Sequence, residues 1–202
     1  MNDRTRAFGQ DKEPSLLDRV GRNLSTRRLR RLIGCVEGRR CADIGCGFDA
    51  ALSVSLFGGA AQVTLVDVAV DPLAASPGTH RIVEGHLPEV LDSIPDKSFD
   101  VIICNNVLEH LWEPEITLRQ FHRLLATSGV CELNVPSWTG KRALEFAAFR
   151  LRVAPASEMN DHKAYYNPKD LWLLLVRSGF RPQDIKVRRH KLTLNTVARV
   201  RS

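Results

Sequence analysis

Short apolar runs alternate with amphipathic stretches along most of the chain. Apolar runs bounded by turn residues predict buried strands over residues 40–44, 62–67, 81–85, 99–104 and 129–135. Apolar positions at helical spacing predict helices over residues 15–36, 50–57, 113–125 and 168–178, and two closing strands are expected over residues 186–190 and 192–200. Strands that alternate with helices predict an α/β fold with a largely parallel sheet.

The length of the chain favours one domain. At about 150 residues per domain, 202 residues fit a single unit over residues 15–202. The polar residues 1–14 before it are expected to form a flexible tail. Residues 136–168 are the longest insertion relative to a minimal alternation of strands and helices. We interpret them as a cover over the substrate, with ordinary additional core as the alternative.

Composition narrows the class of protein. Hydrophobic residues make up 44% of the chain and charged residues 26%, which is typical of globular proteins. No run approaches the ~20 apolar residues of a membrane span, and residues 1–14 lack the apolar stretch of a secretory signal. The five cysteines show no C-x-x-C spacing, which argues against a zinc or disulfide framework. These features together predict a cytoplasmic protein.

The net charge of +6 is unevenly distributed. Residues 1–40 and 181–202 each carry +6, whereas residues 41–180 carry −6. The arginines of residues 27–31 flank an apolar stripe, so a solvated face of a docked helix is the plainest interpretation. The alternatives are contact with an anionic substrate, a membrane surface or nucleic acid. Nucleic acid is disfavoured because no stacking aromatic motif accompanies the arginines.

A glycine-rich turn follows the first expected strand. Gly45-x-Gly47-x-x-Ala50 fits the G-x-G-x-x-G/A pattern of dinucleotide-binding folds, and Asp67 lies 22 residues after Gly45. A nicotinamide or flavin enzyme is therefore one alternative. Asp43, two residues before the first glycine, argues against it because a carboxylate there would repel a pyrophosphate and suit a cationic ligand. Asp67 is placed to accept hydrogen bonds from two ribose hydroxyls.

These residues resemble the first motif of the class I S-adenosylmethionine-dependent methyltransferases, especially those that act on small molecules. The similarity extends from about Arg40 to Phe180. Besides acid-x-Gly-x-Gly, four further pieces carry it: Asp67 after the second strand, Phe99-Asp100 with Leu108-Glu109-His110, Arg123-Leu124-Leu125 before Gly129, and the sequence His162, Tyr165, Leu171, Gly179-Phe180. The resemblance implies a Rossmann-like seven-stranded sheet, mostly parallel with an antiparallel last strand. It also implies a donor site at the carboxyl ends of the first, second and fourth strands.

The resemblance also implies the residues that bind S-adenosylmethionine. The expected donor contacts are Asp43, Gly45 and Gly47 at the methionine part, Asp67 at the ribose, Gly85 and His86 beside the adenine, and Asn105 beneath the sulfonium. Two positions depart from the family pattern. Asp49 replaces a frequent third glycine, and His86 stands where an acid often meets the adenine amino group.

Methyl transfer from a sulfonium is an in-line displacement, so the protein mainly aligns the reacting atoms. A hydroxyl acceptor also needs a general base, and histidine suits that role near neutral pH. His110 is the first candidate and His162 the second, each with a purely structural role as the alternative; Glu109 either orients His110 or faces solvent. We expect no catalytic metal, because Asn105 and Asn106 stand where metal-dependent relatives need acids.

The sequence thus predicts a methyltransferase that acts on a small molecule, with O-methylation as the preferred reaction. Basic residues in and beside the insertion either receive an acidic acceptor or only solubilise the segment: Arg142, Arg150, Arg152 and Lys163. The alternatives are a nucleic-acid-directed methyltransferase, a nicotinamide-dependent oxidoreductase, and a donor-binding protein without catalytic activity. The sequence does not decide the acceptor or the oligomeric state.

Overall fold

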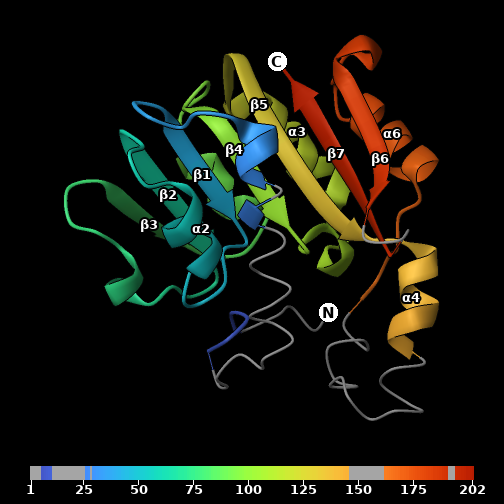
Figure 1. Ribbon diagram of the computed structural model, residues 1–202, viewed down its shortest axis with the longest axis horizontal. Coiled ribbons are helices and arrows are strands. Elements are labelled where there is room, and N and C mark those ends of the chain that lie inside the picture. Colours follow the sequence, from blue (N-terminus) through green and yellow to red (C-terminus); the bar gives the residue numbers. More distant parts are fainter. Residues whose placement is uncertain (1–5, 11–25, 28, 146–161, 191–193) are drawn as a thin grey trace.

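A seven-stranded sheet forms the centre of the protein in the computed structural model, with the strand order β3-β2-β1-β4-β5-β7-β6 (Figure 1). The structure describes residues 6–10, 26–27, 29–145, 162–190 and 194–202. The strands are β1 (Arg40–Ile44), β2 (Gln62–Asp67), β3 (His80–Glu84), β4 (Phe99–Asn105), β5 (Leu125–Pro136), β6 (Ile185–His190) and β7 (Asn195–Arg201).

Helices connect the strands. The α-helices whose ends the structure defines are α2 (Ala51–Leu56), α3 (Pro114–Leu124), α4 (Trp138–Glu145) and α6 (Pro168–Arg177). The 3₁₀ turns are η1 (Pro72–Ala74), η2 (Glu89–Ser93), η3 (Leu108–His110) and η5 (Pro182–Asp184). Residues 26–27 and 29–33 are also helical. No helix among the described residues has the length and hydropathy needed to cross a membrane.

The sheet is covered on both faces because alternate side chains of its strands enter two separate cores. One core joins Cys41 of β1 to Leu56 of α2 and to Ile33 of the N-terminal helical residues. The other core joins Ala42 and Ile44 of β1 to α3 and α6 through buried leucines and phenylalanines. Burial on both faces explains why the central strands are apolar throughout rather than alternating.

The topology confirms the expected fold class. β1, β2, β3, β4 and β5 pair in parallel, whereas β7 is antiparallel to both of its neighbours, β5 and β6. The strand order reverses between β1 and β4, and ligands of open α/β sheets bind at the carboxyl ends of the strands beside such a reversal. The residues after β1, β2 and β4 therefore meet at one edge.

β5 differs from the strand expected over residues 129–135, because it begins at Leu125. The chain leaves α3 directly into the strand, and Phe99 pairs with Leu125 before a register shift restores the pairing of Val101 with Val130. Ser128 takes a positive φ of 66° at this irregularity. A helix followed without a turn by a bulged strand has no clear sequence pattern, which explains the missed residues.

Two expected segments lie partly outside the described residues. Of the helix predicted over residues 15–36, the structure describes residues 26–27 and 29–36. Residues 26–27 and 29–33 are helical, and the helix ends three residues earlier than predicted because Gly34 takes a positive φ of 74°. The predicted cover over residues 136–168 is described only at its two ends, and residues 146–161, with Arg150 and Arg152, fall outside. Its first end forms α4.

Candidate functional site

The glycine-rich turn leaves β1 and bends across the end of β2. The amides of Gly45 and Cys46 both donate to the carbonyl of Val66, at 2.7 and 3.2 Å. Gly45 has a φ of +77°, and a Cβ on it would lie 2.1 Å from Cγ2 of Val107. Glycine is therefore required at this position both by the backbone conformation and by the close approach of the chain that follows β4.

Asp67, the last residue of β2, faces this turn. One carboxylate oxygen accepts from the amide of Gly47 at 2.8 Å, and the other accepts from the amide of Val68 at 2.7 Å. These backbone donors fix the orientation of the carboxylate at the edge of the sheet. The structure thus brings together Gly45, Gly47 and Asp67, as the sequence predicts.

Asp43 lies beneath the turn and not in open space. Only 1% of the residue is exposed, and its carboxylate accepts a hydrogen bond from the hydroxyl of Ser53 in α2. Burial raises the pKa of Asp43 to about 7, Ser53 opposes the rise, and the nearby charge of Asp67 adds to it. Asp43 therefore ties the turn to α2 from below, and a direct contact with the donor's methionine part remains a prediction.

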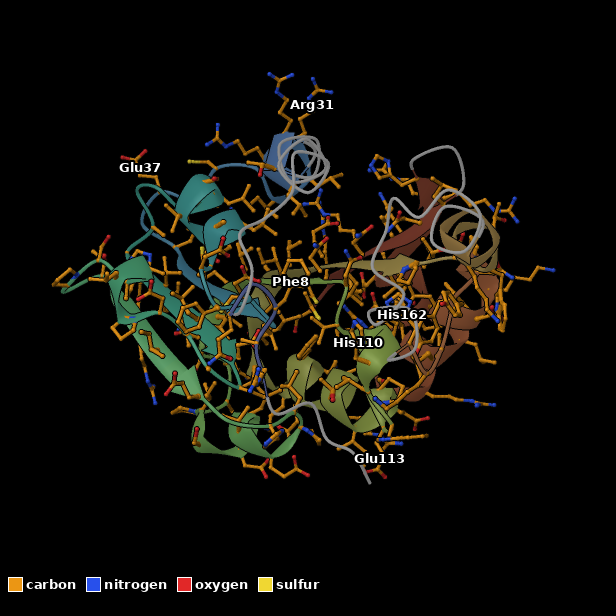
Figure 2. The ribbon with its side chains drawn as sticks, turned by 90° about the horizontal axis from the view of Figure 1, so that it is seen from below. Phe8, Arg31, Glu37, His110, Glu113 and His162 are labelled. Carbon is orange, nitrogen blue, oxygen red and sulfur yellow. The ribbon has the colours of Figure 1, made fainter. Side chains whose placement is uncertain are left out.

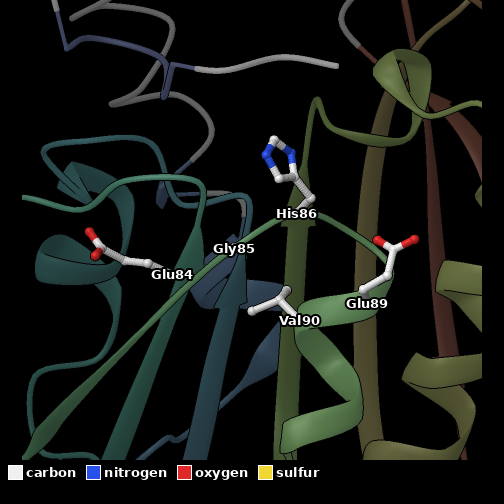
Figure 3. A pocket seen from close by; sticks show the side chains of 5 residues that line it. All are labelled: Glu84, Gly85, His86, Glu89 and Val90. Carbon is white, nitrogen blue, oxygen red and sulfur yellow. The ribbon is translucent and has the colours of Figure 1, made fainter. Parts of the chain in front are cut away.

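An open hollow of about 510 Å³ lies beyond the end of β3. Glu84, Gly85, His86, Glu89 and Val90 line it (Figure 3). The carboxylate of Glu84 accepts from the amide of Val70 at 2.8 Å, which links β3 to the loop after Asp67. The structure places both expected adenine neighbours, Gly85 and His86, on this wall.

Asparagines occupy the ends of β4 and β5. The side-chain amide of Asn134 donates to the side-chain oxygens of Asn105 and Asn106, at 2.9 and 3.0 Å. The amide of Asn106 in turn donates to the carbonyl of Asn134 at 2.8 Å. Asn134 is 4% exposed, so the position of Asn105 at the sheet edge is set from within the protein.

The two predicted bases lie in contact with each other. The rings of His110 and His162 have centroids 4.8 Å apart at an interplanar angle of 64°. Figure 2, which is seen from below relative to Figure 1, labels both histidines close to each other near the centre of the view. Ring nitrogens of the two histidines and a carboxylate oxygen of Glu109 lie within 4.8 Å of one another.

The C-terminal end of the predicted insertion holds the turn that carries His110. The amide of Lys163 donates to the carbonyl of Glu109 at 2.7 Å, and its ammonium donates to the carbonyl of His110 at 2.6 Å. The hydroxyl of Tyr166 donates to the carbonyl of Leu108 at 3.4 Å. All three carbonyls of η3 thus accept from this segment, which is why residues distant in sequence meet at one point.

Comparison with known proteins identifies the family. The profile of the family described as "Methyltransferase domain" matches residues 15–184. The chain belongs to this methyltransferase family. The resemblance noted from the sequence motifs is confirmed.

Relatives of this methyltransferase include two named ubiquinone biosynthesis O-methyltransferase. The protein from Psychrobacter arcticus is 29% identical over 162 residues, which cover 74% of this chain and 62% of the relative. The protein from Pseudomonas aeruginosa is 27% identical over 161 residues, which cover 74% of this chain and 68% of the relative. The match thus spans less than two thirds of the first of these relatives.

A solved structure of a SAM-dependent methyltransferase from Archaeoglobus fulgidus has the same fold. Its TM-score to this chain is 0.64 at 22% sequence identity, over 90% of this chain and 94% of the other. At this identity the similarity shows the fold alone.

The hydroxyl of Tyr165, which belongs to a motif noted in the sequence, lies 3.1 Å from Nδ1 of His162. Two further residues at the candidate site were not expected from the sequence. Asn134 positions Asn105, and the carbonyl of Phe8 accepts from the amide of Phe48 at 2.9 Å beside the glycine turn. Asn134 is a polar residue inside an otherwise apolar run, a pattern that can mark a site; residues 6–10 carry no comparable pattern.

Proposed function

We propose that the protein is an S-adenosylmethionine-dependent methyltransferase that transfers the methyl group to a hydroxyl oxygen of a small molecule. The observation that carries the proposal is the Asp67 carboxylate, held by the amides of Gly47 and Val68 at the carboxyl edge of the sheet. A carboxylate fixed in this way suits the two hydroxyls of a ribose, and charged acceptors of this kind contribute ~1.5–3 kcal/mol each.

The donor fits the residues around Asp67. The turn of Gly45 and Gly47 would border the methionine part, and a side chain at either glycine would meet Val107 or Phe8. Gly85 and His86 border the open hollow that would take the adenine, and Asn105 would lie beneath the sulfonium. Bound S-adenosylmethionine supplies a methyl group on a positively charged sulfur, which is a good leaving group.

The chain's own residues then have to orient the acceptor and remove its proton. His110 is the proposed base, with His162 beside it at a centroid distance of 4.8 Å. The O-methyltransferase relatives support a small hydroxylated acceptor. Two cations near the histidines, Lys141 and Lys163, favour an acceptor with an anionic group.

The five free cysteines support the location proposed from the sequence. All five are free thiols in this structure, as expected of a protein in the reducing cytoplasm. We therefore keep the proposal of a cytoplasmic enzyme.

The test of the proposed function is methyl transfer itself. Purified protein is incubated with S-adenosylmethionine carrying an isotopically labelled methyl group and a small-molecule extract, and labelled products are separated by mass. A labelled product with the methyl group on oxygen supports the proposal. Donor binding without any labelled product would instead support a binding protein without activity, and label in nucleic acid alone would contradict a small-molecule acceptor.

A further inference from the structure

His110 and His162 come from distant parts of the chain but lie ring against ring. Their centroids are 4.8 Å apart, and the interplanar angle of 64° turns the edge of one ring toward the other. Each is half-buried, so water screens charges on them less than at the open surface. Two imidazolium ions at this distance repel each other strongly, and adding a proton to one ring opposes adding a proton to the other.

Charged groups around the pair favour its first proton and disfavour a second one. A carboxylate oxygen of Glu109 lies within 4.8 Å of ring nitrogens of both histidines, which favours the first proton. The ammonium of Lys163 on the carbonyl of His110 and that of Lys141, 5.5 Å from the ring centroid of Tyr165, both disfavour a second one. Among the described groups, the surroundings thus favour no more than one positive charge on the pair.

Tyr165 fixes one member of the pair. Its hydroxyl lies 3.1 Å from Nδ1 of His162, and the two rings pack edge to face with centroids 5.4 Å apart. Tyr165 is itself 8% exposed and packs against Trp138 with centroids 5.5 Å apart. A buried phenol that bonds one ring nitrogen restricts both the rotation of His162 and the place of its proton.

We propose that His110 and His162 act as one base that holds a single proton, and that Tyr165 is the positioning residue that keeps His162 against His110. The catalytic part of this proposal rests on the proposed function. As the bond between the acceptor oxygen and the methyl carbon forms, the bond from the methyl carbon to sulfur breaks and the electron pair stays on sulfur. The hydroxyl proton moves to an imidazole nitrogen of the pair in its neutral form, becomes the single proton that the pair holds, and later leaves to water.

The test uses the full chain without donor or acceptor, so it remains decisive even if the proposed function fails. Histidine labelled with ¹³C at Cε1 is incorporated, and NMR spectra are recorded from pH 4.5 to 9 with EDTA present. Signals of His110 and His162, assigned with His110→Gln and His162→Gln, are each expected to titrate in two steps separated by at least about one pH unit. In either variant the remaining histidine should titrate in one step.

One variant serves as the control for this measurement. His80→Gln removes a histidine at the start of β3 that bonds Thr79, and it should leave both signals unchanged. Independent single-step titration of His110 and His162, unaffected by loss of the other ring, would overturn the shared base.

Tyr165 is tested by removing only its hydroxyl. Tyr165→Phe should move the midpoints of His162 by at least half a pH unit and broaden its signal, because the ring loses its anchor at Nδ1. Tyr166→Phe is the matched control, since it removes the neighbouring hydroxyl, which bonds Leu108 and not His162. Equal shifts in the two variants, or no shift in either, would overturn the positioning role.

Discussion

The amide of Gly47 donates a 2.8 Å hydrogen bond to the carboxylate of Asp67. This bond joins the turn after β1 to the end of β2, and the amide of Val68 holds the other carboxylate oxygen. The turn and the carboxylate therefore form one unit, and loss of either should impair binding of the donor.

Asp67→Ala should weaken the binding of S-adenosylhomocysteine at least tenfold. The substitution removes the proposed acceptor of the ribose hydroxyls and frees the two amides that it holds. Isothermal titration calorimetry measures the effect. Asp184→Ala removes a carboxylate that pairs with Arg181 at the surface and should leave the affinity unchanged. An equal affinity in the two variants would show that Asp67 does not bind the donor.

Gly45→Ala should destabilise the fold more than Gly78→Ala does. Both glycines have positive φ, +77° and +83°, so both substitutions strain the backbone by roughly 1–2 kcal/mol. Only at Gly45 would the new Cβ also meet Val107, at 2.1 Å, whereas nothing lies within 4 Å at Gly78. Urea denaturation compares the two, and equal losses would show that the contact with Val107 does not constrain the turn.

Asp43→Asn should change the pH dependence of stability. Since burial raises the pKa of Asp43 to about 7, the folded state holds its proton between about pH 4 and pH 7, where the unfolded state has released it. Stability from this group is therefore lost as the pH rises through that window, by at most about 4 kcal/mol. The asparagine variant lacks this loss, so its free energy of unfolding should rise relative to that of the wild type from pH 4 to pH 7.

Asp100→Asn is the control with the opposite sign. The hydrogen bond from Arg40 lowers the pKa of Asp100, so its stabilisation is present at neutral pH and is lost as the pH falls through that lowered pKa. This variant should be less stable than the wild type at pH 7 and should approach it in acid. Denaturation at several pH values measures the free energy of unfolding of each variant. If this free energy depended on pH in the same way for Asp43→Asn and the wild type, burial would not raise the pKa of Asp43.

His110→Ala should leave donor affinity intact and reduce turnover at least tenfold, because general-base catalysis contributes 10²–10⁴-fold. Turnover is followed with labelled donor and the acceptor found in the labelling experiment, and donor affinity by calorimetry. Unaltered turnover would eliminate His110 as the base.

Removal of metal ions should not affect the reaction. Asn105 and Asn106 offer no carboxylate at the end of β4, so we expect methyl transfer to proceed in EDTA at the same rate. A loss in EDTA that a divalent cation restores would contradict this, and would direct attention to Glu109, His110 and His162, whose oxygen and nitrogen atoms lie within 4.8 Å of one another.

The sequence predicts the sheet and the donor edge well because local patterns determine both. β1 and β2 are apolar runs bounded by turns, and their carboxyl ends share an edge once the sheet is parallel. Gly45, Gly47 and Asp67 therefore meet as expected.

What the sequence cannot supply is contact that depends on packing between distant segments. Asp43 and Asp67 look alike as acids after strands, yet only Asp43 points into the core toward Ser53, because α2 covers that face of β1. The approach of His162 to His110 depends on Lys163 binding the carbonyls of η3. Neither arrangement has a periodicity or a spacing that a sequence displays.

Calorimetric titration of the wild-type protein tests the central claim most directly. S-adenosylhomocysteine should bind saturably at one site per chain, and NAD should give no heat of binding under the same conditions. Absence of binding by both S-adenosylhomocysteine and S-adenosylmethionine would contradict the assignment of the Gly45–Gly47 turn and Asp67 to the methyl donor.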